Sequence, residues 1–431
     1  MTVSTETSSP VEIGVALETP LRLVLAFGHR DSSRRAVARI ALASCAEVRG
    51  VVPADDARSF VELAQNLRDA EPNAVLVCAA DSKDIGSLNV MLEALRLGCA
   101  AQRPPPRVLA LGPEGIVGRL RPVAGPFALE RFGDEAAAVA ALRALRRGGD
   151  ERLTLRDELI EDAARSLAAS TAGDSVVVDV SERSTSCVLA RAGGELHAAH
   201  VAPLGLGEAA DRVVLHAGVD RVRRWLPWPI DAPALLDRVF NRARWPGALP
   251  ATELALGIEM ALAREAIAHV LRDAAYAGLD VAAMRAAPTA LVTGRAASFP
   301  RRAQTLLVFV DGLEPTAVTA LLREPDDARA ERVALVASLG AGRPVTLRLG
   351  HATGHDDRRV EPGSFTLAPF SGEVEVSAAS GELRGRGHAG ALGLLLDARG
   401  RPLPLPPRDA ERIPAVAGWH AQIGAFASAA R

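Results

Sequence analysis

Continuous apolar runs alternate with helical patterns in the first third of the chain. The runs LRLVLAF (21–27), AVLVCAA (74–80) and RVLALG (107–112) have the length of buried strands, and the first two are followed by polar capping residues and helical spacing. Unbroken apolar strands that alternate with helices indicate a parallel sheet covered on both faces. We therefore predict an α/β domain over residues 20–148. Residues 1–19, rich in Ser, Thr and Glu, are predicted to be a flexible leader.

The pattern changes after Gly148-Gly149, where we expect a hinge followed by a helix. The runs SVVVDV (175–180), TSCVLA (185–190) and ELHAAHV (195–201) are separated by short turns. Runs of this length with tight turns between them predict a three-stranded antiparallel meander, not another parallel unit.

A long helix is predicted next, because apolar residues recur every four positions from Leu254 to Val270. Thr252 is its expected N-cap and Gly278 its expected stop. The runs TALVTG (289–294) and TLLVFVDG (305–312) are predicted to be two more strands. Together these elements define a second domain over residues 149–335.

From about residue 336 onward the chain has short strand patterns between Gly and Pro turns and little helical period. This texture predicts a β-rich C-terminal region, residues 336–431, as a small domain or an extension of the preceding one. A terminal helix anchored by Trp419 is expected to end it.

Composition narrows the class of protein. The formal net charge is -2, which argues against a nucleic-acid binder, and 48% hydrophobic residues indicate a globular chain. The four cysteines form no CxxC pair and are predicted to be buried thiols in a reducing compartment. We find no signal-peptide pattern and no run of about 20 apolar residues, so we expect a cytoplasmic protein with no membrane partner.

The segment VVVDVSERSTSCVLA (176–190) poses the main functional question. It begins like the phosphate-binding hairpin of an ATPase, with a buried strand that ends in Asp179 and a turn of hydroxyl residues. The turn lacks the glycines that let backbone N–H groups approach phosphate. An ordinary strand whose turn is closed by local Asp and Ser hydrogen bonds is the alternative.

Several separated stretches, in order along the chain, resemble the glutamate mutase L family, MutL-type accessory proteins of cobalamin-dependent mutases within the actin/hexokinase/Hsp70-like ATPase superfamily. They include VVVDVSERSTS, HVAPLGLG, LALGIEMALAREAI and LVTGRAASFP. The resemblance implies an α/β fold with actin-like (ribonuclease H-like) lobes and mixed sheets. It also implies a vestigial nucleotide site made of Asp179, Arg183, Ser184, Thr185, Ser186, Gly207 and Gly294.

This chain departs from the family pattern at the nucleotide segments. Ser181 and Glu182 stand where the hairpin glycines would be, and Arg295 stands in the adenosine turn. We therefore predict a non-catalytic, accessory or scaffold protein with no bound cofactor; ATP with Mg would bind only to a site that is still active. An ATPase that uses Arg183 and Arg295 as phosphate ligands, and an actin-like assembly protein, are the alternatives.

The resemblance implies a protein partner, the subunits of a cobalamin-dependent mutase, and we leave open a homo-oligomer. A candidate partner surface gathers arginine and tryptophan, the residue types enriched in interface hot spots. It comprises Arg223, Arg224, Trp225, Trp228 and Trp245. Packing of these tryptophans in the core is the alternative.

Two weaker motifs have simple structural interpretations. His351 and His355 are spaced like metal ligands, but Thr353 and Gly354 favour a loop, so we predict no metal site there. Arg30 and Arg34 follow the first predicted strand and would suit an anion at a helix N-terminus, but solvent-facing arginines on a capped helix fit equally.

Overall fold

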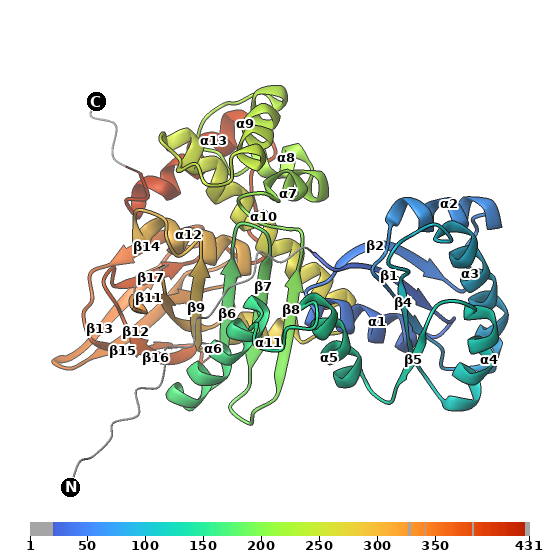
Figure 1. The fold of residues 1–431 in the computed structure, drawn as a ribbon. Coiled ribbons are helices and arrows are strands. Elements are labelled where there is room, and N and C mark those ends of the chain that lie inside the picture. The colour runs from blue at the N-terminus through green and yellow to red at the C-terminus, as the bar shows by residue number, and fades with distance from the viewer. Residues whose placement is uncertain (1–19, 326–328, 341, 382, 427–431) are drawn as a thin grey trace, which may run out of the picture.

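The computed structural model describes residues 20–325, 329–340, 342–381 and 383–426; the predicted leader, residues 1–19, lies outside the described residues. Within them the chain forms three β-sheets, of five, eight and four strands, and helices pack on the first two (Figure 1). The fold is therefore mixed α/β, as the sequence predicted at that level.

The N-terminal sheet is parallel throughout and has the strand order β2-β1-β3-β4-β5. Its strands are β1 (Arg22–Phe27), β2 (Glu47–Pro53), β3 (Ala74–Cys78), β4 (Arg107–Leu111) and β5 (Leu129–Phe132). The helices between and after them are α1 (Asp31–Ala43), α2 (Phe60–Ala70), α3 (Ile85–Gly98, preceded by the 3-10 turn η1, Ser82–Asp84), α4 (Glu114–Ala124) and α5 (Glu135–Arg146). One apolar cluster joins α2, α3 and α4 to one face, and a second joins α1 and α5 to the other.

The central sheet has eight strands in the order β14-β17-β11-β10-β9-β6-β7-β8. They are β6 (Ser175–Val180), β7 (Thr185–Ala190), β8 (Leu196–Val201), β9 (Thr289–Gly294), β10 (Val318–Arg323), β11 (Glu331–Ser338), β14 (Phe365–Ala368) and β17 (Leu394–Asp397). β6, β7 and β8 form an antiparallel meander, while β9 runs parallel to β6 and β10 parallel to β9. The remaining three strands continue the sheet beyond β10.

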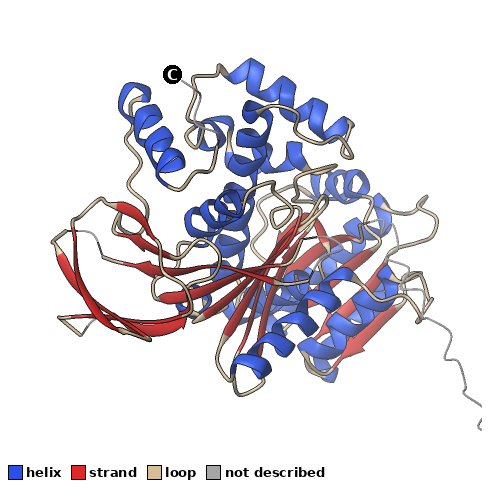
Figure 2. Cartoon of the chain, turned by 90° about the vertical axis from the view of Figure 1, so that its left-hand side faces the viewer, coloured by secondary structure: helices blue, strands red, loops and turns tan. Residues whose placement is uncertain are grey.

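Different elements cover the two faces of this sheet. One face packs against α10 (Glu253–Tyr276) and α12 (Arg302–Leu313), and α6 (Arg156–Thr171) covers β6 and β7 on the other. Beside α6 lies the third sheet, which is antiparallel with the order β13-β12-β15-β16 (Figure 2). Its strands are β12 (Val345–His351), β13 (Gly354–Val360), β15 (Glu373–Ala378) and β16 (Arg384–His388). The C-terminal region thus contributes both to the central sheet and to a sheet of its own.

A helical cap lies at one end of the central sheet, at the top of Figure 1. It consists of α7 (Ala210–Ala217), α8 (Val219–Arg223), α9 (Ala232–Arg244) and α13 (Asp409–Gln422); the short helix α11 (Val281–Ala286) follows α10. Trp419 of α13 packs its ring 4.6 Å from the guanidinium of Arg399, which confirms it as an anchor of the terminal helix.

The predicted meander, the strand at 289–294 and the long helix are confirmed. The side chain of Thr252 accepts the Ala255 N–H at 3.1 Å at the start of α10, and Gly278 follows the helix with a φ of 80°. The strand predicted at 305–312 is wrong, because these residues belong to α12. Every residue from Ala303 to Leu313 is buried, so this helix has no polar face and its sequence cannot be told from that of a buried strand.

Within the described residues, no helix is both long enough and apolar enough to cross a membrane.

Candidate nucleotide cleft

The turn between β6 and β7 is closed by its own hydroxyl groups. Ser181 donates its N–H to the Ser184 carbonyl at 2.9 Å, and the Ser181 Oγ accepts the N–H of Ser184 at 3.2 Å. The hydroxyl of Thr185, the first residue of β7, donates to the Leu204 carbonyl at 2.7 Å. Local hydrogen bonds of this kind stabilise a turn without a ligand. The hydroxyl donors that the sequence placed at a phosphate are therefore engaged within the chain.

The segment 203–207 packs directly on this turn. Leu204, Leu206 and Gly207 donate their N–H groups to the carbonyls of Arg183, Ser181 and Glu182, at 2.9, 2.8 and 3.0 Å. A Cβ at Gly205 would lie 2.5 Å from the Glu182 carbonyl carbon. Glycine is required there because two backbones meet. The structure thus gives Gly207 a backbone contact with the hairpin.

Asp179, at the end of β6, is fully buried and shares both carboxylate oxygens with other side chains. Arg156, the first residue of α6, approaches its Oδ1 through Nη2 at 2.6 Å and its Oδ2 through Nε at 3.2 Å. Thr293 of β9 donates its hydroxyl to Oδ1 at 2.8 Å. A bidentate guanidinium is a strong partner for a buried carboxylate. Arg156 therefore supplies the positive charge that faces Asp179.

The turn after β9 carries the third predicted nucleotide segment. Gly294 has a φ of 67°, and a Cβ there would lie 2.8 Å from the Asp179 Oδ1, so glycine is required by both its conformation and its neighbour. Arg295 binds the buried Glu259 of α10 through Nε at 3.1 Å and Nη2 at 3.2 Å, and reaches Glu182 at 3.4 Å. Arg242 of α9 also contacts Glu259, at 3.1 Å. Glu182 of the hairpin and Arg295 of the β9 turn therefore belong to one ion-pair network.

Two hollows remain on either side of the hairpin. One, of about 450 Å³, lies between the hairpin and the β9 turn and is lined by Arg295, Leu249 and Phe299 among others. The other, of about 770 Å³, lies between the hairpin and the N-terminal unit, with Arg156 and Ser186 in its lining. Charged side chains of both signs line each hollow.

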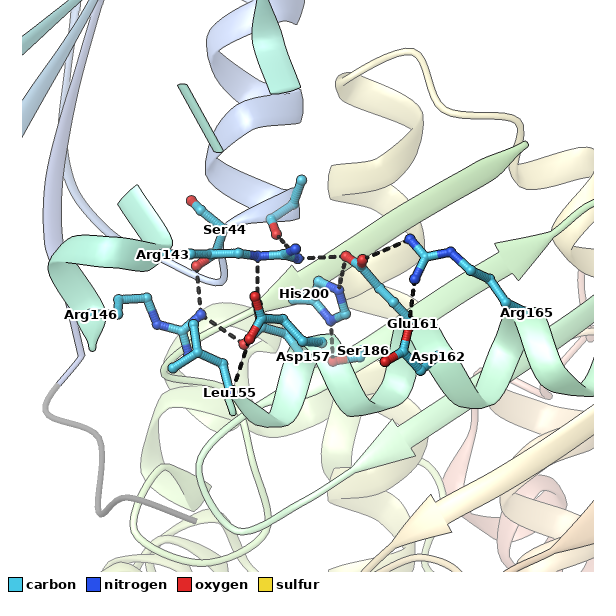
Figure 3. A network of polar contacts seen from close by, with 12 residues as sticks. Ser44, Arg143, Arg146, Leu155, Asp157, Glu161, Asp162, Arg165, Ser186 and His200 are labelled. Carbon is cyan, nitrogen blue, oxygen red and sulfur yellow. Dashed lines mark hydrogen bonds and ion pairs between the residues drawn. The ribbon is translucent and has the colours of Figure 1, made fainter. Parts of the chain in front are cut away.

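Ser186 takes part in a buried polar network that the sequence did not reveal (Figure 3). Its Oγ lies 2.8 Å from Nδ1 of His200 on β8, and Nε2 of His200 lies 3.4 Å from the Glu161 carboxylate on α6. Arg143 of α5 donates to the same Glu161 oxygen at 2.5 Å. Burial alone would raise the pKa of Glu161, but the hydrogen bonds from His200 and Arg143 outweigh it and lower this pKa to about 2.

The same network ties the N-terminal unit to the central one. Arg146 of α5 donates to the Ser44 carbonyl at the end of α1 at 2.8 Å and to Asp157 of α6 at 2.7 Å. Asp157 and Glu161 are both buried. Three helices from two units thus meet at these charges. The clustering of arginine in LRALRR (142–147) and of acids in RDELIED (156–162) is the one sequence signal that points to the contact.

The five residues of the predicted partner surface do not lie together in one environment. Trp225 is 4% exposed and donates its indole N–H to Glu265 at 2.8 Å, an acid that Arg224 also binds. Trp228 packs 5.1 Å from the ring of Phe426, and Arg223 pairs with Asp220. Of the three tryptophans, only Trp245 is exposed to solvent, at 65%. Trp225 is therefore packed in the core, whereas Trp245 remains a candidate for contact with a partner.

The two weaker motifs form no common site. His351 pairs with Gly354 and His355 with Gly350 across the β12–β13 hairpin, so the two imidazoles leave opposite faces of the sheet. Among the described residues, no three His, Cys, Asp or Glu side chains are grouped to hold a metal ion. Arg30 pairs with Asp81 at 3.1 Å, and Arg34 with Asp31.

Comparison of the chain with protein-family models finds no match, and no curated protein matches it significantly.

Proposed function

We propose that this chain is an actin-like accessory protein that acts as a scaffold and engages the acid and the turn of its candidate nucleotide site with its own side chains and backbone. The strand order β8-β7-β6-β9-β10 supports the actin-like part of the proposal. Three antiparallel strands followed by two strands parallel to the first are the arrangement of a ribonuclease H-like lobe, on which actin-like folds are built. The N-terminal sheet is all-parallel, so the proposal concerns the central sheet alone.

The pairing of Asp179 with Arg156 is the main support for our proposal that the chain does not hydrolyse ATP. A nucleotide–metal complex needs an acidic oxygen that faces the metal and backbone donors that face the phosphates. Here a guanidinium faces the acid, and the turn backbone bonds to segment 203–207. Arg183 and Arg295, the ligands that an atypical ATPase would use, pair with Glu208 and Glu259. We therefore favour the scaffold over the ATPase.

Calorimetry with Mg-ATP at millimolar concentration tests this part. We expect no saturable heat, because binding would require the Asp179–Arg156 pair and several backbone hydrogen bonds to break. Mg-ADP and free Mg are the controls. A dissociation constant in the low micromolar range, about −8 kcal/mol, would contradict the proposal.

The partner follows from the sequence resemblance, and we propose the subunits of a cobalamin-dependent mutase. Co-expression with such subunits from the same source is the test. We expect a complex that co-elutes in fixed ratio during size-exclusion chromatography, with or without ATP. A complex that forms only with ATP would contradict the nucleotide-independent role, and separate elution in all conditions would contradict the partner.

A further inference from the structure

Helix α9 presents an apolar centre between opposite charges on the outer side of the helical cap. Phe240 is 48% exposed, although Leu235 and Val239 on the inner side of the same helix are buried. Asp237 lies three residues before Phe240 and Arg244 four residues after it, so all three share one face of the helix. Both charged residues are exposed, and neither forms an ion pair with another described residue. In Figure 1, α9 lies at the top of the molecule, away from the three sheets.

The loop after α9 carries two strongly exposed side chains, one of which, Leu249, also lines the hollow beside the hairpin. Trp245 is 65% and Leu249 is 81% exposed. The loop between them is held in place, because the Ala248 carbonyl accepts hydrogen bonds from Arg295, at 3.1 Å, and from Arg242. The Ala248 N–H also closes a turn on the Trp245 carbonyl at 3.1 Å. Side chains on such a restrained loop lose less conformational entropy on binding than those on a mobile one.

The spacing of charges on α9 matches a second copy of itself. In a two-fold symmetric contact, residue i of one copy meets residue j of the other, and j meets i. If two α9 helices pack antiparallel with the axis between Phe240 and Asn241, Asp237 faces Arg244 of the second copy, and the reverse pair forms as well.

We propose that α9 and its following loop form a symmetric, antiparallel dimer contact between two copies of this chain. This contact does not depend on the proposed scaffold function. Its apolar part is limited to Phe240 and Trp245, so the buried area is below that of a standard interface of about 800 Å² per partner. The dimer is therefore weak and reversible, with a dissociation constant on the order of 10–100 μM.

Charge reversal tests the register directly. Sedimentation velocity of the full chain, from about 1 to 200 μM, measures the dissociation constant. Asp237→Arg and Arg244→Asp each create two like-charge contacts per dimer, and each should weaken association at least about tenfold. The double variant Asp237→Arg/Arg244→Asp restores both pairs with reversed sign, and its dissociation constant should return to within about threefold of the original.

Two further variants separate the α9 contact from general association. Phe240→Asp should abolish the dimer, whereas Val61→Asp, at an apolar position on α2 that is 69% exposed, should leave it unchanged. All of these side chains are exposed, so the variants should fold, and circular dichroism checks that they do. A wild-type chain that stays monomeric at 200 μM would overturn the proposal. Failure of the double variant to restore association, or equal weakening by Val61→Asp, would also overturn it.

Discussion

Ser186 illustrates why the polar residues of the cleft could not be placed from the sequence. The family resemblance assigned it to a nucleotide, and the structure places it against His200. That contact exists because Ser186 and His200 are direct partners in the β7–β8 ladder. A shift of the register by one residue would turn one of the two side chains to the opposite face of the sheet. Every residue of β7 is buried, so its sequence has no alternation of apolar and polar positions from which the register could be inferred, and the pair was missed.

The ion pairs of Glu161 make stability depend on pH. The pKa of this carboxyl falls from an ordinary 4.5 to about 2 in the folded protein. A depressed pKa means that the stabilisation is complete above pH 4.5 and is lost as the pH falls toward 2. After allowance for partial solvent contact, we expect it to amount to about 2 kcal/mol. Urea unfolding of wild type and Glu161→Gln should show this difference at pH 7 and a much smaller one near pH 2.5.

Glu93→Gln, which changes an exposed acid on α3, is the matched control and should leave unfolding at both pH values unchanged. If Glu161→Gln and wild type differ by the same amount at both pH values, the carboxylate of Glu161 does not carry the stabilisation that we assign to it.

At the scale of elements, two neighbouring helices show what a hydrophobic pattern can and cannot decide. α10 was predicted because apolar residues recur every four positions along it and because Thr252 and Gly278 mark its ends. α12 has 12 residues, almost all buried, and its N-cap residue, Arg301, is not one of the residue types that mark a helix start. The four-residue period and the marked ends identified α10, whereas α12 shows no polar face from which a helical period could be recognised. Even α10 is buried without interruption from Leu256 to Ile267, so its apolar stripe did not reveal how completely it is enclosed.

The enclosure of α10 predicts a strong effect of a single charge. Ile258 and Leu262 are both almost fully buried in the largest apolar cluster. Ile258→Asp or Leu262→Asp should cost several kcal/mol, about 4 or more, because the new carboxylate has no cationic partner there. Ala275→Asp, at an exposed position of the same helix, should cost less than about 1 kcal/mol. Thermal unfolding measures both, and equal melting temperatures for Leu262→Asp and wild type would mean that α10 is not a core helix.

At the scale of the whole molecule, the N-terminal and central sheets are joined through charges as well as apolar contacts. The sequence could indicate the alternation of strands and helices in the first unit, since each element there has its own local pattern. It could not indicate that β11, β14 and β17 add to a sheet that begins with β6, because the strands of that sheet are spread over residues 175–397 and their spatial order does not follow the chain. The charge clusters at 142–147 and 156–162 point to a contact between α5 and α6, but they do not identify Arg146 and Asp157 as the pair that meets.

Removal of Arg146 should therefore loosen the junction. Arg146→Ala leaves Asp157 buried with weaker compensation, which we expect to cost about 3 kcal/mol. Trypsin should then cleave the connection at residues 147–155 at least about five times faster, because opening of the junction exposes it. Arg152 in this connection already has a 90% exposed side chain.

Electrophoresis of the digest distinguishes a loosened junction from general unfolding. The first should yield two stable fragments divided near residue 150, and the second a complete digest. Arg68→Ala, at an exposed position on α2, is the control and should be cleaved at the wild-type rate. Arg146→Ala that resists trypsin as well as the control does would show that apolar contacts alone hold the two units together.

The guanidinium of Arg156 beside Asp179 has a consequence for regulation. An ATPase of the actin type responds to the energy state of the cell, since its shape follows which nucleotide occupies the cleft. Arg156 is covalently attached and always charged, so its local concentration does not change with growth, starvation or stress. A scaffold held in this way would keep one shape at every ratio of ATP to ADP. Control over it would then act through how much of the chain is synthesised and degraded, and through the supply of its binding partners.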